Sequence, residues 1–500
     1  MNKILLTLAV VCAMATVHAP AQTQPSASAA APPPPGSWEQ WVQNAKNPLD
    51  WFSWGGDMRV RNEYFDNAIT LDERAKRHEQ DSIRFRGRIW ASAAPVTNLN
   101  INARLTAEPR EFMKPAFCST HANDSGMEWR YGVFDALNIK WTEAFDQPLT
   151  LTAGRQDVMF GEPLNWWLVA DGTPFDGSWT MYFDSLRATY EAKEVQTKLD
   201  LVYIYQSAFP DDWIPTLGQS SKNFAPGLGR KPYYVTEQDE QGVILYASNK
   251  SLKNTQLDGY FIYKKDNRVH TDILPNGDNA NIYTIGGKVS GAPAEHWLYS
   301  AEGAYQFGNK QDPTVAAAYV VSPSAWRDIS AFGVNANLTY EFKDTLKNRA
   351  SLAFEYLSGD DPNTRGTDEM FDVLWGRWPR FSELYIYSYV NENSGKIAQL
   401  NNIMRIGPTW GFTPVRNTTF SATYNALFAP ESVPTRRSGA AVGEFSNDGH
   451  FRGHFLQTVL KHQFSKHVSG HLWGECLWER DFYTQHDLMT FVRAELMFTF

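Results

Sequence analysis

The chain has 500 residues and a formal net charge of -9, from 46 basic and 55 acidic side chains. This balance argues against a nucleic-acid partner, because such partners select basic surfaces. Its mean hydropathy is -0.43, and no apolar run after the first residues approaches the roughly 20 residues of a membrane helix. The composition therefore excludes a helical membrane protein, although 14% of the residues are aromatic, a high share for a soluble protein.

Residues 1–21, MNKILLTLAVVCAMATVHAPA, have the features of an export signal. Lys3 lies in a short basic region, an apolar run follows it, and Ala19-Pro20-Ala21 is an A-x-A cleavage site. We therefore expect cleavage after Ala21 and export to the bacterial envelope. Cys118 and Cys476 remain after cleavage, and two cysteines so far apart predict free thiols rather than a disulfide framework.

Two short segments precede the main part of the chain. Residues 22–36 form a Pro/Ala/Ser-rich linker that has no capacity to build a core. Residues 37–56 form an aromatic lead-in segment that starts with a short helix, predicted from Ser37 as N-cap and Gln40 three residues later. Its tryptophans could rest on a membrane interface or plug one mouth of a barrel. A simple lead-in segment is the plainer interpretation.

From residue 57 to residue 500, short segments with alternating polarity are separated by clusters of Gly, Asn, Asp and Pro. SIRFRGRIWASA (82–93), NLNINARLTAE (98–108) and FGVNANLTYEF (332–342) show the alternation clearly. We count roughly 16–18 such segments, and an even number is expected for a bacterial barrel. The pattern predicts an all-β fold, a transmembrane antiparallel β-barrel with apolar residues facing lipid and polar residues facing the lumen.

The last ten residues, FVRAELMFTF, form a two-faced strand that ends on a bulky apolar residue. One face carries Val492, Ala494, Leu496, Phe498 and Phe500. The other face carries Arg493, Glu495 and Thr499, with Met497 as the one apolar exception. A final strand of a soluble sandwich would also fit. In a barrel this would be the strand that closes against the first strand.

Arginines are concentrated on the first predicted strands. Arg84, Arg86 and Arg88 alternate with apolar residues on one strand, and an arginine on a lipid face costs about 2–4 kcal/mol at the membrane midplane. These three side chains must therefore point into the lumen. Arg59 and Arg61 share a face of the preceding strand, and Arg104 adds to the row from the following strand.

Carboxylates are expected to neutralise part of this row. Glu63, Glu108 and Glu355 are candidate partners in the lumen. The local acids Asp57 and Glu63 are fewer than the arginines of the first two strands, so we expect a positive stripe to remain. Such a stripe would attract an anionic solute.

Other chemistry finds little support. His467, His471 and Glu475 are spaced by four, but glycines interrupt the segment and favour a strand over a metal-binding helix. The loop DDPNTRGTDEMFD (360–372) resembles a calcium loop in part, but Arg365 occupies a ligand position. The sequence lacks G-x-S-x-G, H-E-x-x-H and phosphate-binding glycine motifs. We expect no enzyme activity, no cofactor and no metal.

Three motifs, in order, resemble the alginate-export family of outer-membrane barrels. They are Gly154-Arg155-Gln156 followed by Gly161, then Phe183-Asp184-Ser185-Leu186-Arg187, and Ser358-Gly359-Asp360. The resemblance implies an 18-stranded barrel in the bacterial outer membrane that passes anionic polysaccharide or a related solute. It also implies that Arg155 and Arg187 are channel arginines, and that the assembly machinery of the outer membrane recognises the barrel through Phe500.

The leading hypothesis is an outer-membrane channel for alginate-like polyuronate or related anionic solutes, with an arginine-lined lumen. The alternatives are a general or oligosaccharide porin, a barrel enzyme, and a soluble secreted β-protein that binds carbohydrate. Expected partners are the lipid bilayer, the anionic solute and the outer-membrane assembly machinery. Periplasmic polysaccharide-handling proteins are further candidate partners.

Overall fold

The computed structural model describes most of the chain from residue 34 onward. The described residues are 34, 36–75, 78–113, 126–128, 132–160, 181–209, 214–217, 236, 238–269, 277–311, 325–376, 381–385, 388, 392, 400–434 and 444–500. The predicted export signal and nearly all of the predicted linker therefore lie outside the described residues, as does Cys118. Cys476 is a free thiol.

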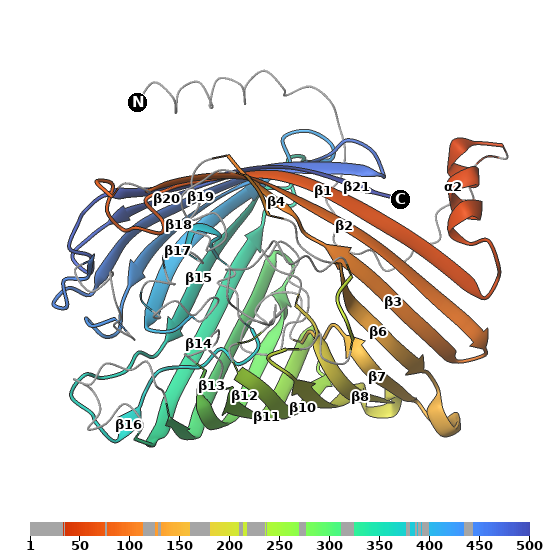
Figure 1. Cartoon of the computed structure of the whole chain (residues 1–500), viewed down its shortest axis with the longest axis horizontal. Helices are drawn as coiled ribbons and strands as arrows, with labels where there is room; N and C mark the ends of the chain where they lie inside the picture. The colour runs from red at the N-terminus through yellow and green to blue at the C-terminus, as the bar shows by residue number, and fades with distance from the viewer. Residues whose placement is uncertain are drawn as a thin grey trace.

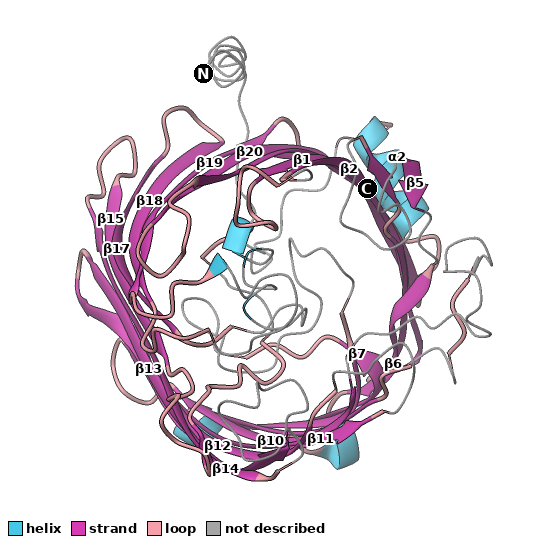
Figure 2. Ribbon diagram, turned by 60° about the vertical axis from the view of Figure 1, so that its left-hand side comes forward, coloured by secondary structure: helices cyan, strands magenta, loops and turns pink. Residues whose placement is uncertain are grey.

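Eighteen antiparallel strands of the described chain form a closed ring (Figures 1 and 2). Each strand pairs with its sequence neighbour in the ring, and the last strand pairs with the first. The strands are β1 (Phe52–Asp66), β2 (Glu79–Val96), β3 (Leu99–Ala107), β6 (Val133–Trp141), β7 (Leu149–Gln156), β8 (Phe183–Ala192), β9 (Thr197–Gln206), β10 (Gln238–Asn249), β11 (Thr255–Arg268), β12 (Asn279–Ala294), β13 (Trp297–Gln311), β14 (Arg327–Glu341), β15 (Arg349–Leu357), β17 (Ile403–Phe412), β18 (Thr418–Phe428), β19 (Phe451–Gln463), β20 (Val468–Glu479) and β21 (Leu488–Thr499). The predicted transmembrane β-barrel is confirmed.

Three short strands and two short 3-10 helices complete the connections. β4 (Arg110–Phe112) pairs with β2 and with β5 (Gly126–Glu128), whereas β16 (Thr367–Asp368) pairs in parallel with β14. The helices η1 (Ala144–Asp146) and η2 (Lys193–Val195) lie in two short turns. Short turns join the strands at one end of the barrel and long connections join them at the other, as in outer-membrane barrels.

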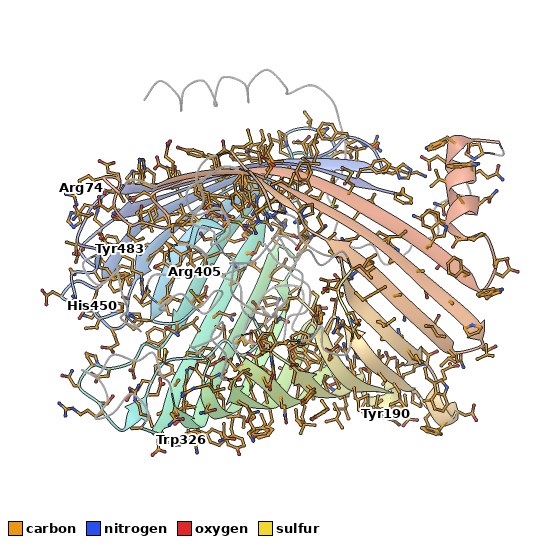
Figure 3. All side chains as sticks on the ribbon, viewed as in Figure 1. Arg74, Tyr190, Trp326, Arg405, His450 and Tyr483 are labelled. Atoms are coloured by element: carbon orange, nitrogen blue, oxygen red, sulfur yellow. The ribbon has the colours of Figure 1, made fainter. Side chains whose placement is uncertain are left out.

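The strand wall has an apolar outer face. Leu186, Ile285 and Leu496 are 57%, 56% and 56% exposed, and Tyr190 and Trp326 also project from the outer edge of the wall (Figure 3). The inner face is largely polar and buried. In a soluble protein the apolar side chains lie inside and the polar ones outside, and here the distribution is reversed. A barrel whose outer side contacts lipid has this distribution.

The last strand closes the ring against the first. In the β1–β21 register Arg61 lies opposite Glu495, and the backbone of Phe500 exchanges two hydrogen bonds with Gly56, at 3.1 and 3.3 Å. Leu496 and Phe498 of β21 are exposed on the outer face, whereas Arg493 is fully buried on the inner face. The predicted two-faced closing strand is therefore confirmed.

One helix, α2 (Trp38–Lys46), precedes β1. Ser37 caps it as predicted, with its hydroxyl accepting a hydrogen bond from the Gln40 N–H at 3.2 Å. The helix lies outside the ring of strands, so it does not plug the lumen (Figure 2). β1 begins at Phe52, inside the predicted lead-in segment. No helix within the described part of the chain is long and apolar enough to span a membrane.

Candidate functional site in the barrel lumen

The arginines of β1 and β2 share the inner face of the wall. The register places Arg59 opposite Arg86 and Arg61 opposite Arg84, and residues opposite each other in a sheet lie on the same face. All four are almost fully buried, whereas the adjacent Met58 is 55% exposed on the outer face. Strand alternation therefore places these side chains, and Arg88 with them, inside the barrel.

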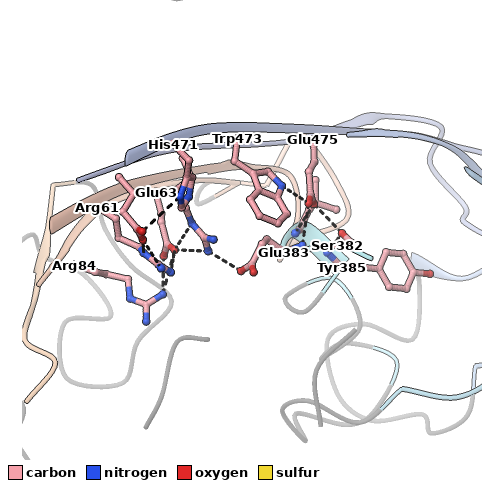
Figure 4. Close-up of polar contacts among 12 residues, drawn as sticks. Arg61, Glu63, Arg84, Ser382, Glu383, Tyr385, His471, Trp473 and Glu475 are labelled. Atoms are coloured by element: carbon pink, nitrogen blue, oxygen red, sulfur yellow. Dashed lines mark hydrogen bonds and ion pairs between the residues drawn. The ribbon is translucent and has the colours of Figure 1, made fainter. Parts of the chain in front are cut away.

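The acids that the sequence suggested hold part of this row. Asp57 pairs with Arg88 at 2.5 Å and more loosely with Arg86 at 3.6 Å. Glu63 pairs with Arg84 at 3.0 Å and with Arg61 at 3.3 Å (Figure 4). Two carboxylates thus contact four of the five arginines.

Three further carboxylates pair with these arginines: Glu108, which the sequence suggested, and Glu383 and Glu495 from distant parts of the chain. Glu495 of β21 binds Arg61 at 2.5 Å and lies 3.7 Å from Arg59, which also pairs with Glu108 at 3.4 Å. Glu383, from the connection between β15 and β17, binds Arg493 at 2.6 Å. These partners leave much less positive charge than the local count of acids predicted.

Arg493 is a functional candidate that the sequence analysis did not select. It lies on the inner face of β21 and binds Glu63 at 2.7 Å, which joins the last strand to the first (Figure 4). Its place on the polar face of a closing strand was a signal that could have identified it. We call these groups the arginine cluster: Arg59, Arg61, Arg84, Arg86, Arg88 and Arg493 with Asp57, Glu63, Glu108, Glu383 and Glu495.

Two arginines of the cluster retain hydrogen-bonding capacity. Arg59 Nε and Nη1 and Arg86 Nε have no hydrogen-bond acceptor among the described residues. The two side chains are only 1% and 4% exposed. A buried charged donor without an acceptor is costly, so this part of the lumen favours an added anion.

Arg104 and Arg187 also lie on the inner face, away from the cluster. Arg104 of β3 binds Asp135 at 2.7 Å and Asp157 at 3.0 Å, and Arg187 of β8 binds Asp200 at 2.8 Å. Both arginine side chains are close to one-fifth exposed. They are therefore paired but within reach of water in the lumen.

Arg155 does not follow the lumen row. The register places it opposite Leu137 and Asp184, in line with the exposed Leu186 rather than with Arg187. Its guanidinium makes two hydrogen bonds to the Asp184 carboxylate, at 2.9 and 3.1 Å, and lies 3.9 Å from the ring of Tyr182. Arg155 is therefore held in a buried ion pair with Asp184, and its role as a channel arginine stays a prediction.

The described residues of the connection between β15 and β17 contact the inner face of the wall. Trp375 is fully buried, and its ring contacts the inner face of the wall at Gly242 and Phe183. The backbone of Asp372 exchanges two hydrogen bonds with the side chain of Gln306 on β13. We call described residues 358–376 and 381–385 the lumen segment.

A buried carboxylate fixes the second part of the lumen segment. Glu475 of β20 accepts hydrogen bonds from the backbone N–H groups of Glu383 and Leu384, at 3.0 and 2.8 Å, and from the Ser382 hydroxyl at 2.8 Å (Figure 4). Gln457 and Trp473 donate to the same carboxylate. The anion therefore caps a short turn and holds it against the wall.

The residues considered for metal binding have other contacts. His467 contacts the Thr499 carbonyl, His471 contacts Glu495, and Glu475 caps the lumen segment. In the loop considered for calcium, Asp361 accepts from Asn363, while Asp372 lies by the wall. The part of the chain that the structure describes holds no group of three or more His, Cys, Asp or Glu residues suited to a metal.

Comparisons with solved structures agree with an outer-membrane porin fold. OccAB1 of Acinetobacter baumannii is 11% identical with a TM-score of 0.54, covering 89% of this chain and 96% of that protein. OpdL of Pseudomonas aeruginosa is 10% identical with a TM-score of 0.50, covering 90% and 99%. The fold and the polar lumen thus define a β-barrel channel of the bacterial outer membrane.

The sequence model of the alginate export family matches residues 235–493, more than half of the chain. The chain therefore belongs to the alginate export family, which confirms the resemblance seen in the sequence. The matched range includes Ser358-Gly359-Asp360 and excludes the two earlier motifs. A search of curated proteins finds no match.

Proposed function

We propose that this outer-membrane channel conducts anionic solutes, and that alginate-like polyuronate is its substrate class. The observation that carries the proposal is the Arg59–Arg86 pair, directly opposite each other with N–H groups that lack acceptors among the described residues. Neighbouring guanidiniums repel each other, so an anion between them removes both the repulsion and the unmet hydrogen bonds. A carboxylate suits this place because it accepts paired hydrogen bonds from arginine.

The paired arginines of the cluster would pass the solute onward by exchange. Each guanidinium already binds a resident carboxylate, so an incoming uronate replaces one carboxylate by another. Such an exchange keeps each contact weak enough to release, which conduction requires. Arg104 and Arg187 would continue the positive surface where the lumen contains water.

The test is ion selectivity in a planar bilayer. Wild-type protein should show an anion-selective reversal potential under a salt gradient, and oligouronates should block the current. Arg59→Gln with Arg86→Gln should weaken both effects. The matched control is Arg405→Gln, an arginine of β17 that is paired with Glu355 elsewhere in the lumen.

A cation-selective wild-type channel, or a double variant with unchanged selectivity and block, contradicts the proposal. An effect of Arg405→Gln equal to that of the double variant would show that only total lumen charge matters. That result would exclude a specific anion-binding role for the Arg59–Arg86 pair.

The lumen segment favours a second candidate, a porin for small anionic solutes. Its tryptophan is fully buried against the wall, so a polysaccharide needs the segment to move, whereas a small solute does not. Exclusion of sized neutral polymers from the pore separates the two candidates. If the pore admits only the smallest neutral polymers, both in the absence of oligouronate and after oligouronate is added, the small-solute porin is supported.

A further inference from the structure

The helix before the barrel is attached to the outside of the closure seam between β21 and β1. The indole N–H of Trp54, on the outward row of β1, donates to the Ala45 carbonyl of α2 at 2.6 Å. Trp54 also packs edge-on against Phe500, with 5.4 Å between ring centroids. The helix is thus joined to the wall where the last strand meets the first.

A second attachment fixes the end of the barrel at which the helix lies. Glu39 of α2 pairs with Lys466 and lies 3.4 Å from His467. Both partners belong to the short turn between β19 and β20. Short turns face the periplasm in outer-membrane barrels, so α2 lies at the level of the inner leaflet.

The apolar residues of α2 share one stripe but differ in their exposure. Val42, one turn after Trp38, is only 5% exposed, so protein covers it. Trp38 and Trp41 are 66% and 60% exposed and stack on each other, with 4.8 Å between centroids. A stacked tryptophan pair open to water would leave a large apolar surface unburied.

Lipid is the occupant that continuity with the barrel supports. At the same end of the wall, Trp141, Phe145, Trp297 and Trp410 are exposed on the outer side, and the Trp141 and Phe145 rings are in contact at 4.7 Å. Tryptophan collects at the headgroup level of membranes because its ring is apolar and its N–H is polar. The α2 tryptophans extend this aromatic collar beyond the strands.

We infer that α2 is an interfacial helix that lies along the inner leaflet of the outer membrane, with Trp38 and Trp41 among the lipid headgroups. Its polar residues Glu39 and Gln43 face away from the lipid, as in other interfacial helices. The helix holds the closure seam at a fixed depth in the bilayer. This role does not depend on the solute that the channel carries.

Spin labels can measure which face of α2 contacts lipid. In a Cys118→Ser, Cys476→Ser background, the protein without residues 1–21, which contain the third cysteine, would carry a label in phospholipid nanodiscs at Trp41→Cys or, as the matched control, at Gln43→Cys. The label at position 41 should collide several-fold more with oxygen than with a water-soluble nickel chelate. The label at position 43 should show the opposite preference.

A second measurement avoids cysteine substitution. Brominated phospholipids should quench wild-type fluorescence more than that of Trp38→Phe with Trp41→Phe, and both proteins should shift in electrophoresis when boiled, which reports folding. Nickel-chelate access at position 41 equal to that at position 43, or no difference in quenching, would overturn the inference. A protein partner rather than lipid would then be the occupant of this face.

Discussion

Arg155 and Asp184 join two sequence motifs that are almost thirty residues apart along the chain. Two hydrogen bonds of 2.9 and 3.1 Å link the guanidinium of β7 to the carboxylate of β8, and both side chains are buried. Arg155, which the resemblance implies is a channel arginine, is thus held in a buried ion pair between two strands of the wall.

Arg155→Ala should destabilise the barrel without changing its ion selectivity. The variant leaves a buried carboxylate without its cation, which costs about 3–5 kcal/mol of unfolding free energy. Urea unfolding in lipid vesicles measures the loss, and reversal potentials measure selectivity. Arg74→Ala is the control, because this exposed arginine pairs with Asp72 at the surface and its loss should leave the unfolding free energy almost unchanged. A clear selectivity change in Arg155→Ala would support the channel role.

Replacing Arg84, Arg86 and Arg88 together by serine should shift selectivity from anions toward cations. The change removes three of the positive charges that contact Asp57 and Glu63, so the carboxylates of the cluster become the majority. Oligouronate block should weaken as well. Planar-bilayer recordings under a salt gradient test this, and unaltered selectivity in a variant that folds would contradict it.

Glu475→Gln should loosen the lumen segment. A glutamine keeps the volume but loses the charge that accepts the N–H groups of Glu383 and Leu384. Each lost hydrogen bond to a charged acceptor costs about 1.5–3 kcal/mol. Single-channel recordings should show larger or noisier conductance than wild type. Glu191→Gln, an exposed carboxylate of β8, is the control, and identical traces for both variants would refute a restraining role of Glu475.

Removal of Phe500, or Phe500→Asp, should lower the amount of folded protein in the outer membrane. The backbone of Phe500 forms hydrogen bonds with Gly56, and its ring packs on Trp54. We propose that the assembly machinery also recognises this residue. Electrophoresis of unboiled and boiled membrane fractions measures folded protein. Refolding of the purified variants into vesicles separates the two roles, since lost recognition lowers only the yield in cells. Normal assembly of both variants would show that the terminal residue is incidental.

The connection after β15 should loosen as the pH rises. Burial, and then the nearby Asp368 carboxylate, raise the pKa of Asp360 to about 8, while Arg327 binds Asp360 at 2.5 Å. A raised pKa in the folded state stabilises the protein at low pH, and this stability is lost as the pH rises through about 8. The protection of residues 358–370 from hydrogen exchange, corrected for the intrinsic pH dependence of exchange, should therefore fall as the pH rises toward about 8 and change no further above it. Asp360→Asn should remove the dependence, and a variant with the same transition would exclude this carboxylate.

The sequence by itself determined the fold class and the faces of the strands. A period of two is a local property of the chain, so alternation alone placed Arg84 and Arg86 on the inner face and Leu496 on the outer face. The cost of an arginine in lipid then fixed which face was which. The helix that begins after Ser37 could also be predicted from the sequence, because an N-cap depends on four consecutive residues.

Tertiary structure decided the charge of the lumen. Glu383 and Glu495 reach the arginines of β21 and β1 from a connection and a strand far away in sequence, so no local count of acids could include them. The register likewise decided that Arg155 lies opposite Asp184. Such pairings depend on ring closure and on the path of the lumen segment, and these are set by contacts between residues hundreds of positions apart.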